Sequence, residues 1–501
     1  MTAPESEPTR AFSNPGGSEP GPAHMLERAR VAAARGDLAA ALAECEAAHR
    51  GSPQSLAPII LALEILAAPG GAQEIARWAD LGLALAPSDL RFLSSKAYAL
   101  ELGGDFDVAA VYWRRARSLA GDAGAFALEI GRCLLHANAL SESAEVLGQA
   151  LAAAAPQNPL RAALERTLGE VRLRGADITG FALYQARDCT DGAAFEIAGI
   201  PRWRGENLAG RSLLATHHLG FGDQMLLASL VSVLARRGAT VTLTCDRTLS
   251  DLLSASLTGV RVVGMDSRPT HPHFPPPPEL TRLVNTLRPD FHGSLLGVCA
   301  HLSIEEVADG SNHVPLVPPP LAIAAARARI AAVRGRFPDR RIIGLVFDCA
   351  QRHSPQMGGF VRAFSERRSI PSRIVGRLTG DAAVRQSHHF ISLHTAAHEQ
   401  DLGPMPANVS SLDARALADF GATAAIVAAL DGVVTVDCGV ANLACKLGAP
   451  TRVLVQHGCE WRWGVSGPTT PWLPSARIYR QPTPGDWNEV VDRLIADLAA
   501  C

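Results

Sequence analysis

Apolar and small residues recur with helical spacing over residues 23–190, interrupted by turn residues at a fixed interval. One series, 34 positions apart, is Gly36, Gly70, Gly104 and Asn138, and a second, spaced by 34, 34 and 35, is Pro53, Pro87, Gly121 and Pro156. A turn inside a helical hairpin and a second turn that closes it therefore repeat together. Because one such hairpin cannot bury its apolar face alone, the pattern predicts about four hairpins stacked into a solenoid.

The 34-residue period is typical of tetratricopeptide repeats. Small side chains such as Ala39, Ala43 and Ala47 follow the first turn, where two helices must approach closely. An alanine-rich helical bundle without true repeats is the alternative that the residues leave open. Residues 1–22 hold several Pro and Gly and no apolar core, so we expect a disordered leader and neither a signal peptide nor a membrane span.

Short apolar runs alternate with helical segments after residue 191, which predicts parallel β/α units. The predicted strands are Leu213–Thr216, Thr240–Thr244 and Val260–Val263 in a first set, and Ile342–Phe347, Phe390–Leu393, Val433–Val436 and Arg452–Val455 in a second. The expected fold class is therefore α plus α/β. Helical repeats would occupy residues 23–190, one Rossmann-like half residues 191–335, and a second such half residues 336–501.

Opposite charges nearly cancel along the chain, with 47 Lys and Arg against 49 Asp and Glu and no basic cluster. This balance argues against nucleic acid or a membrane surface as a partner. The ten cysteines form no C-x-x-C pair and no set at zinc spacing, so a reduced, cytoplasmic protein is expected. Only Lys96 and Lys446 are lysines, so phosphate contacts would fall mostly to arginine, whose planar fork binds two oxygens at once.

The first candidate site is the glycine-rich turn Gly220–Asp223, which follows a predicted strand. Glycines let a ligand approach the backbone, and a helix that begins there directs free N–H groups at an anion or a sugar. Asp223 could act as a general base on an acceptor hydroxyl, or it could simply stabilise the first turn of the helix. The residues that we assign to the acceptor side are Gly220, Gly222, His218 and His292.

The second candidate site is Thr435–Asn442, where a predicted strand ends and a helix begins. Ligands of open α/β sheets bind at the carboxyl ends of strands and diphosphates bind at helix N-termini, so we expect a nucleotide here. The alternative is an ordinary turn with Asp437 as the helix cap. Arg368, in a segment predicted to open another helix, could hold a pyrophosphate. The donor-binding residues would be Arg368, Asp437, Cys438, Gly439 and Asn442, and no metal site is predicted.

Several short motifs in this order resemble bacterial proteins in which tetratricopeptide repeats precede a domain of glycosyltransferase family 9, the heptosyltransferases, and more distantly the O-GlcNAc transferases. The motifs are Phe181–Tyr184, Pro201–Glu206, Leu208–Arg211, Gly220–Asp223, Arg368–Pro371, Thr435–Gly439, Gly448–Pro450, Trp461–Trp463, Pro471–Trp472 and Gly485–Trp487. The resemblance covers nearly the whole chain after the leader.

This resemblance implies a GT-B fold, in which two Rossmann-like halves face a cleft and the C-terminal half holds most of the nucleotide-sugar. It implies no essential metal and no cofactor besides that co-substrate. Asp223 matches the candidate catalytic carboxylate of the family, and Arg368 and Asp437–Gly439 match positions near the donor diphosphate. The chain departs from the family at Cys438 and Asn442, where the family usually has Thr and His.

The leading hypothesis is a cytoplasmic, metal-independent glycosyltransferase of hexosyl or heptosyl type. It would move a sugar from a nucleotide-sugar to a hydroxyl of a protein or glycan that the repeats recruit. The alternative is a non-catalytic scaffold or binding protein with a degenerate GT-B domain, which the departures at Cys438 and Asn442 favour.

Overall fold

The computed structural model describes residues 21–67, 71–122, 124–190, 196–266, 277–310, 313–350 and 359–500. The chain divides into two compact units, residues 1–96 and 97–501. The predicted leader up to residue 20 and the predicted turn at Gly70 lie outside the described residues.

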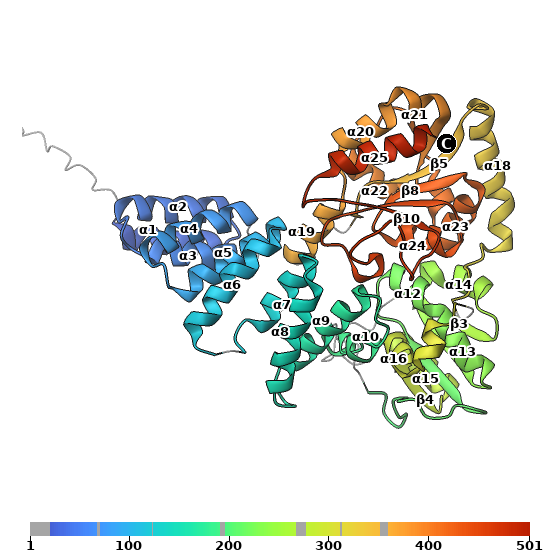
Figure 1. Ribbon diagram of the computed structural model, residues 1–501, viewed down its shortest axis with the longest axis horizontal. Helices are drawn as coiled ribbons and strands as arrows, with labels where there is room; N and C mark the ends of the chain where they lie inside the picture. The colour runs from blue at the N-terminus through green and yellow to red at the C-terminus, as the bar shows by residue number, and fades with distance from the viewer. Residues whose placement is uncertain are drawn as a thin grey trace, which may run out of the picture. The chain divides into compact units, whose positions relative to one another are not determined.

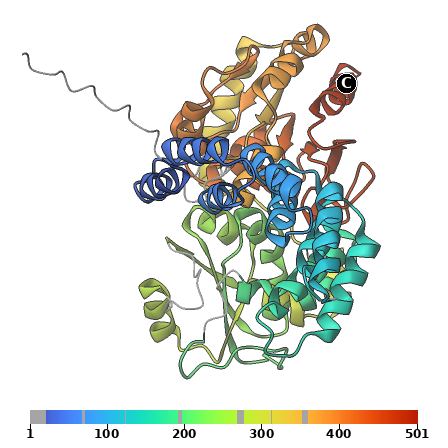
Figure 2. The same ribbon diagram turned by 90° about the vertical axis from the view of Figure 1, so that its left-hand side faces the viewer.

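The first unit consists of helical hairpins, drawn in blue in Figures 1 and 2. Its helices are α1 (Pro22–Ala34), α2 (Leu38–Gly51), α3 (Ala57–Leu66) and α4 (Ala72–Leu85), and α5 (Leu90–Gly103) crosses into the second unit. From α1 to α4 each helix packs on the next, and the turn between α1 and α2 has Gly36 at φ +80°, a left-handed conformation that glycine adopts without strain.

The repeat pattern continues in the second unit as α6 (Phe106–Ala120), α7 (Ala127–His136), α8 (Leu140–Ala153), α9 (Arg161–Arg174), α10 (Gly180–Tyr184) and α11 (Arg187–Thr190). Gly104 and Asn138 occupy the turns within two hairpins, at φ +91° and +66°. Gly121 lies between α6 and α7 at φ +68°, as the second series of turn residues predicts. The predicted order of hairpins is therefore the observed one wherever its turns are described.

The first parallel sheet contains β1 (Ser212–Thr216), β2 (Thr240–Asp246), β3 (Val260–Met265) and β4 (Phe291–Ser294), in the order β3-β2-β1-β4. The helices that follow its strands are α12 (Phe221–Leu227), α13 (Val231–Arg236), α14 (Ser250–Ser256), α15 (Pro278–Leu287), α16 (Leu295–His301) and α17 (Ile304–Ala308). A 3₁₀ turn at Ala228–Leu230 separates α12 from α13. The pattern did not predict β4.

The second parallel sheet contains β5 (Arg341–Val346), β6 (His388–Ser392), β7 (Val409–Ser410), β8 (Gly432–Val436), β9 (Thr451–Val455) and β10 (Ala476–Arg480), in the order β10-β9-β8-β5-β6-β7. Its helices are α18 (Pro320–Arg336), α19 (Gly359–Arg368), α20 (Ser372–Gly380), α21 (Ala382–Ser387), α22 (Ala396–Leu402), α23 (Phe420–Ala429), α24 (Gly439–Lys446) and α25 (Trp487–Ala499). The predicted fold class, helical repeats followed by two Rossmann-like halves, is thereby confirmed.

One expectation about Arg368 is wrong. The segment Arg367–Pro371 does not open a helix, because Arg368 is the last residue of α19 and α20 starts only at Ser372. Pro371 directly precedes α20, and a proline disfavours helical geometry in the residue before it, so α19 has to end first.

The last helices of the repeats share a hydrophobic core with both halves. The Phe181 ring packs edge-on against Trp461 and Trp472, with centroids 6.0 and 5.8 Å apart. Helix α10 packs on α16 of the first half, and α9 packs on the 3₁₀ turn Trp461–Trp463 of the second half (Figure 1). This common core holds the end of the repeat array against both halves.

Over the described ranges, no helix has both the length and the apolar character needed to cross a membrane.

A pair of glycine substitutions tests the close packing of α9 against α10. A Cβ at Gly169 would lie 2.4 Å from the backbone nitrogen of Tyr184, so Gly169→Ala should lower the free energy of unfolding by about 1–3 kcal/mol or more. Gly148, inside α8, has open space around a Cβ, so Gly148→Ala should raise it by about 0.5–1 kcal/mol. Urea unfolding of both variants measures the difference, and shifts of the same sign would contradict this packing.

Candidate functional site

A cavity of about 800 Å³ lies at the carboxyl ends of β1, β5 and β8, and helices α7 and α9 of the repeats form another of its walls. β1 adjoins β4 in the first sheet, and β8 adjoins β5 in the second, so both sheets reverse their strand order next to the cavity. Such topological switch points are where open α/β sheets bind ligands. The cavity also has the size of a small-molecule site.

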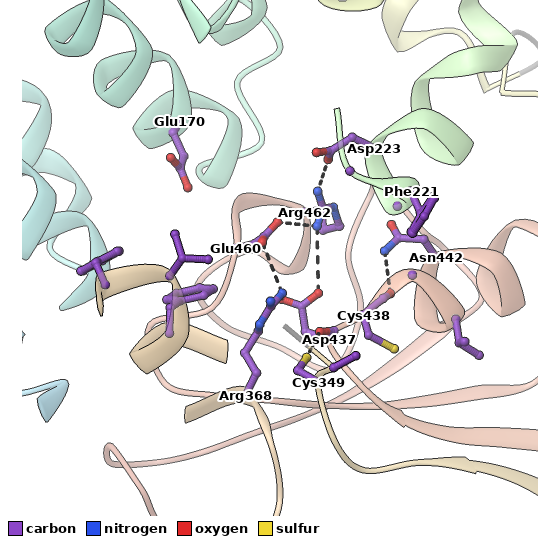
Figure 3. A pocket seen from close by; sticks show the side chains of 18 of the residues that line it. Glu170, Phe221, Asp223, Cys349, Arg368, Asp437, Cys438, Asn442, Glu460 and Arg462 are labelled. Carbon is purple, nitrogen blue, oxygen red and sulfur yellow. Dashed lines mark hydrogen bonds and ion pairs between the residues drawn. The ribbon is translucent and has the colours of Figure 1, made fainter. Parts of the chain in front are cut away.

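Both glycine-bearing turns predicted from the sequence meet at this cavity (Figure 3). The predicted residues that line it are Gly220, Gly222, Asp223, Arg368, Asp437, Cys438, Gly439 and Asn442. A Cβ at Gly222 would lie 2.6 Å from Nδ2 of Asn442, so a larger residue where α12 approaches α24 would displace the Asn442 side chain. Asn442 Nδ2 donates a hydrogen bond of 3.0 Å to the carbonyl of Cys438.

The two histidines assigned to the acceptor side do not line the cavity. Nε2 of His218 lies 3.2 Å from Oδ1 of Asp188, and His292 is part of β4, where its N–H donates to the carbonyl of Pro201. Both side chains are buried in the first half. The structure therefore does not bring His218 and His292 together with the other predicted residues.

The alternative reading of Asp437 as a helix cap is wrong, because Cys438 is the residue that caps α24. The Asp437 side chain is buried at the end of β8, with its carboxylate 3.9 Å from Arg368 and 4.0 Å from Arg462. Asp437 is thus held between two guanidinium groups on the cavity wall.

Arg462 is the centre of the charged network and was missed as a site residue by sequence reasoning. Its guanidinium donates to Oδ1 of Asp223 in the first half, and to Oε2 of Glu460 at 2.5 Å in the second half. Arg462 lies between Trp461 and Trp463, and all three side chains are buried. An arginine flanked by two tryptophans was the available sequence signal, because such neighbours predict that the charge is buried and must find carboxylate partners.

Two further arginines complete the network. Arg187 from α11 lies 3.3 Å from Oδ2 of Asp223, and Arg368 lies 3.5 Å from Glu460. Both oxygens of Asp223 are therefore held by guanidinium groups, one from the repeats and one from the second half. Three arginines face three carboxylates, so the network is close to neutral without any ligand.

The pKa values of the two carboxyls of the second half shift in opposite directions, because Glu460 lies closer to the arginines than Asp437 does. Burial favours the neutral form of Glu460, but Arg462 and Arg368 outweigh it and hold its pKa at about 2. Asp437 lies farther from the same arginines, and burial together with the negative charge of Glu460 raises its pKa. Glu460 therefore keeps its negative charge to a lower pH than Asp437 does.

The repeats contribute side chains to the cavity, which sequence reasoning did not foresee. Arg132 and His136 reach it from α7, and Arg166 and Glu170 reach it from α9. No local sequence signal identified these four side chains. The 34-residue period predicts which residues form turns, but it does not predict which face of a repeat helix contacts another part of the chain. Within the described ranges, no cluster of three His, Cys, Asp or Glu residues could hold a metal ion.

The apolar side of the cavity contains Phe360 and Phe364 of α19. His136 stacks on Phe106 and contacts both phenylalanines, and its Nδ1 lies 3.3 Å from the carbonyl of Gly458. Burial, with a smaller contribution from nearby arginines, lowers the pKa of His136 to about 3. Burial and His398 likewise lower the pKa of His394 to about 3.

No protein-family model matches the chain, and no curated protein matches it. Among solved structures it is similar to a family 9 glycosyl transferase from Veillonella parvula DSM 2008, with 12% identity over 60% of this chain and 99% of that chain and a TM-score of 0.43. It is also similar to a mutant O-GlcNAc transferase of Thermobaculum terrenum, with 13% identity over 96% and 91% of the two chains and a TM-score of 0.28.

The helical part is similar to a tetratricopeptide-repeat protein of Thermus thermophilus, with 17% identity over 35% of this chain and 93% of that chain and a TM-score of 0.26. At such identities the likeness concerns the fold alone.

Removal of Arg462 should destabilise the protein strongly. Arg462→Met leaves the buried Asp223 and Glu460 without their shared partner, so we expect a loss of about 3–5 kcal/mol in the free energy of unfolding. The control Arg477→Met removes an exposed arginine that pairs with Asp497, and should cost less than about 1 kcal/mol. Urea unfolding checks both values, and equal losses would show that the network contributes no more than a surface ion pair.

Acid should destabilise the protein through its buried histidines. The unfolded chain binds protons at histidine below the ordinary pKa of 6.5, whereas folded His136 and His394 stay neutral down to about pH 3. The contribution of these two histidines to the free energy of unfolding is therefore complete above about pH 6.5 and is lost as the pH falls below that value. In His136→Gln, which keeps a donor for Gly458, melting temperatures should fall less steeply between pH 6.5 and 4.5. Parallel curves for this variant and the wild type would refute the assignment.

Proposed function

We propose that the protein is a glycosyltransferase that binds a nucleotide-sugar in this cavity and transfers the sugar to an acceptor hydroxyl. The observation that carries the proposal is the position of Arg368 beside the start of α24, at the carboxyl end of β8. A guanidinium fork and the free N–H groups of a helix N-terminus together fit a diphosphate.

Arg368 is prepared for an anionic ligand by its surroundings. It is buried, its Nη2 donates to the hydroxyl of Ser365 at 3.2 Å, and its guanidinium carbon lies 5.1 Å from the centroid of the Phe364 ring. These contacts hold the guanidinium in place, so less conformational entropy is lost when a ligand binds. Fixed positive charge of this kind stabilises the negative charge that develops on a departing diphosphate.

The arrangement also supports the finer parts of the proposal. Arginines supply positive charge in the cavity, so the transfer is proposed to need no metal ion. A hexosyl or heptosyl unit would lie between Gly222 and the network of Arg462. The acceptor, a hydroxyl of a protein or glycan, would enter along α7 and α9, since these repeat helices border the cavity. Reduced cysteines, none of them paired among the described residues, suit the cytoplasmic location proposed.

A second candidate function is binding of a nucleotide-sugar without transfer. The departures from the family at Cys438 and Asn442 favour it, because Cys is a weaker hydrogen-bond donor than Thr and Asn does not titrate as His does. The engagement of both Asp223 oxygens favours it too, since the matched catalytic carboxylate has an arginine at each oxygen. The two candidates differ in turnover and share the binding site.

Nucleotide-sugars should raise the melting temperature of the purified protein, because a ligand that binds only the folded state stabilises it. We would test UDP-, GDP- and ADP-sugars in the presence of EDTA and follow both thermal shift and release of nucleoside diphosphate. Stabilisation with release identifies a transferase and its donor class. Stabilisation without release favours the second candidate, and no response to any donor refutes the proposal.

Arg368→Lys should reduce the donor-induced shift, because lysine keeps the charge and loses the bidentate fork. The matched control is Arg377→Lys on α20, whose guanidinium donates to the carbonyl of Asn488 outside the cavity. This control should keep the full donor-induced shift. A normal shift in Arg368→Lys would place the diphosphate elsewhere.

A further inference from the structure

Transfer of a sugar to a hydroxyl requires a group that accepts the hydroxyl proton. The residue that matches this role in the family, Asp223, has Arg462 at one carboxylate oxygen and Arg187 at the other. These ion pairs connect the first half to the second half and to the repeats. The geometry therefore gives Asp223 the role of positioning two arginines, and the proton acceptor has to be sought elsewhere in the cavity.

Glu170 of α9 is placed differently. Figure 3 shows its side chain reaching from the repeat helix into the cavity, opposite the network of Arg462 and Glu460. In the part of the chain that the structure describes, no hydrogen bond or ion pair engages its carboxylate. Glu165, earlier on the same helix, lies outside the cavity lining and pairs with Arg161 at 3.0 Å. Glu170 is thus a carboxylate that faces the cavity and is not used to hold the structure together.

We infer that Glu170, supplied by the helical repeats, is the catalytic residue that accepts the proton of the acceptor hydroxyl. This inference rests on the proposed function. It assigns the proton transfer to the repeat array, so the two Rossmann-like halves do not contain a complete site without α9. Asp223 acts as a positioning residue through Arg462 and Arg187.

The step balances with the groups that are present. The acceptor O–H bond breaks and its proton passes to the Glu170 carboxylate, while the oxygen forms a bond to the anomeric carbon of the donor. The bond between that carbon and the diphosphate oxygen breaks, and its electron pair leaves with the nucleoside diphosphate, beside Arg368. Glu170 then returns its proton to solvent before the next turnover.

The surroundings of Glu170 make its carboxylate a better base. Burial, reinforced by the negative charge of Glu460, raises its pKa above the ordinary value. The guanidinium groups of Arg166, Arg187 and Arg174 act in the opposite direction and do not cancel the rise. A carboxyl whose pKa moves toward neutrality accepts a proton more readily in a transition state at neutral pH.

Glu170→Gln tests the assignment with water as the acceptor, by following nucleoside diphosphate release from the panel of nucleotide-sugars. General bases contribute roughly 100- to 10,000-fold, so kcat should fall at least about 100-fold. The donor-induced thermal shift should stay unchanged, because Glu170 lies across the cavity from Arg368. Glu170→Asp should recover part of the rate, and the rise of kcat with pH in the wild type should be absent in Glu170→Gln.

Glu165→Gln is the matched control, since it removes a carboxylate from the same helix and should keep the wild-type rate. Wild-type turnover in Glu170→Gln overturns the role of Glu170 and leaves the proposed transferase standing. Equal losses in Glu165→Gln and Glu170→Gln would also overturn it, since they would reflect damage to α9. A wild-type protein that binds no donor, or binds one without release, refutes the transferase itself and this inference with it.

Discussion

The charge of one buried arginine is the constraint on which the site depends. Arg462 has lost its water, so it must be surrounded by carboxylates, and those come from Asp223 in the first half and from Glu460 and Asp437 in the second. Arg187 extends the same network to the repeats. These buried pairs therefore link the two halves and the repeats at the wall of the cavity.

The network also decides which carboxylates of the cavity are available for proton transfer. A carboxylate whose two oxygens each pair with a guanidinium group is engaged in holding the structure, whereas a carboxylate without such pairs is open to an acceptor. Asp223 and Glu170 illustrate this division. The repeats then serve the site directly, because α7 and α9 border it and α10 is fixed to Trp461 and Trp472 by edge-on aromatic contacts.

Local patterns predicted most of the fold because each depends on near neighbours in sequence. Turn residues such as Gly36 and Gly104 adopt left-handed geometry, and the predicted apolar runs became β1, β2, β3, β5, β6, β8 and β9. The pattern missed β4, β7 and β10. β4 reads Phe-His-Gly-Ser and β7 has two residues, so neither carries an apolar run, and in β10 arginines at the second and fifth positions interrupt the apolar residues. These three strands form because neighbouring strands and helices pack against them, and the local sequence pattern does not show which segments those neighbours are.

The sequence by itself determined the order of elements and the two glycine-bearing turns, because turn geometry and close backbone approach limit which residues fit. It also indicated Asp437 and Asn442, since the strand end and the helix start that they occupy are visible in the pattern. Arg368 does line the cavity, but it ends a helix and does not open one. Only the tertiary structure decided that His218 and His292 lie away from the cavity, and that Arg462 and Glu170 belong to it. Those positions depend on how segments that are distant in sequence pack together. Ion pairs between buried residues from three parts of the chain produce no repeating pattern in the sequence, so the sequence alone does not predict them.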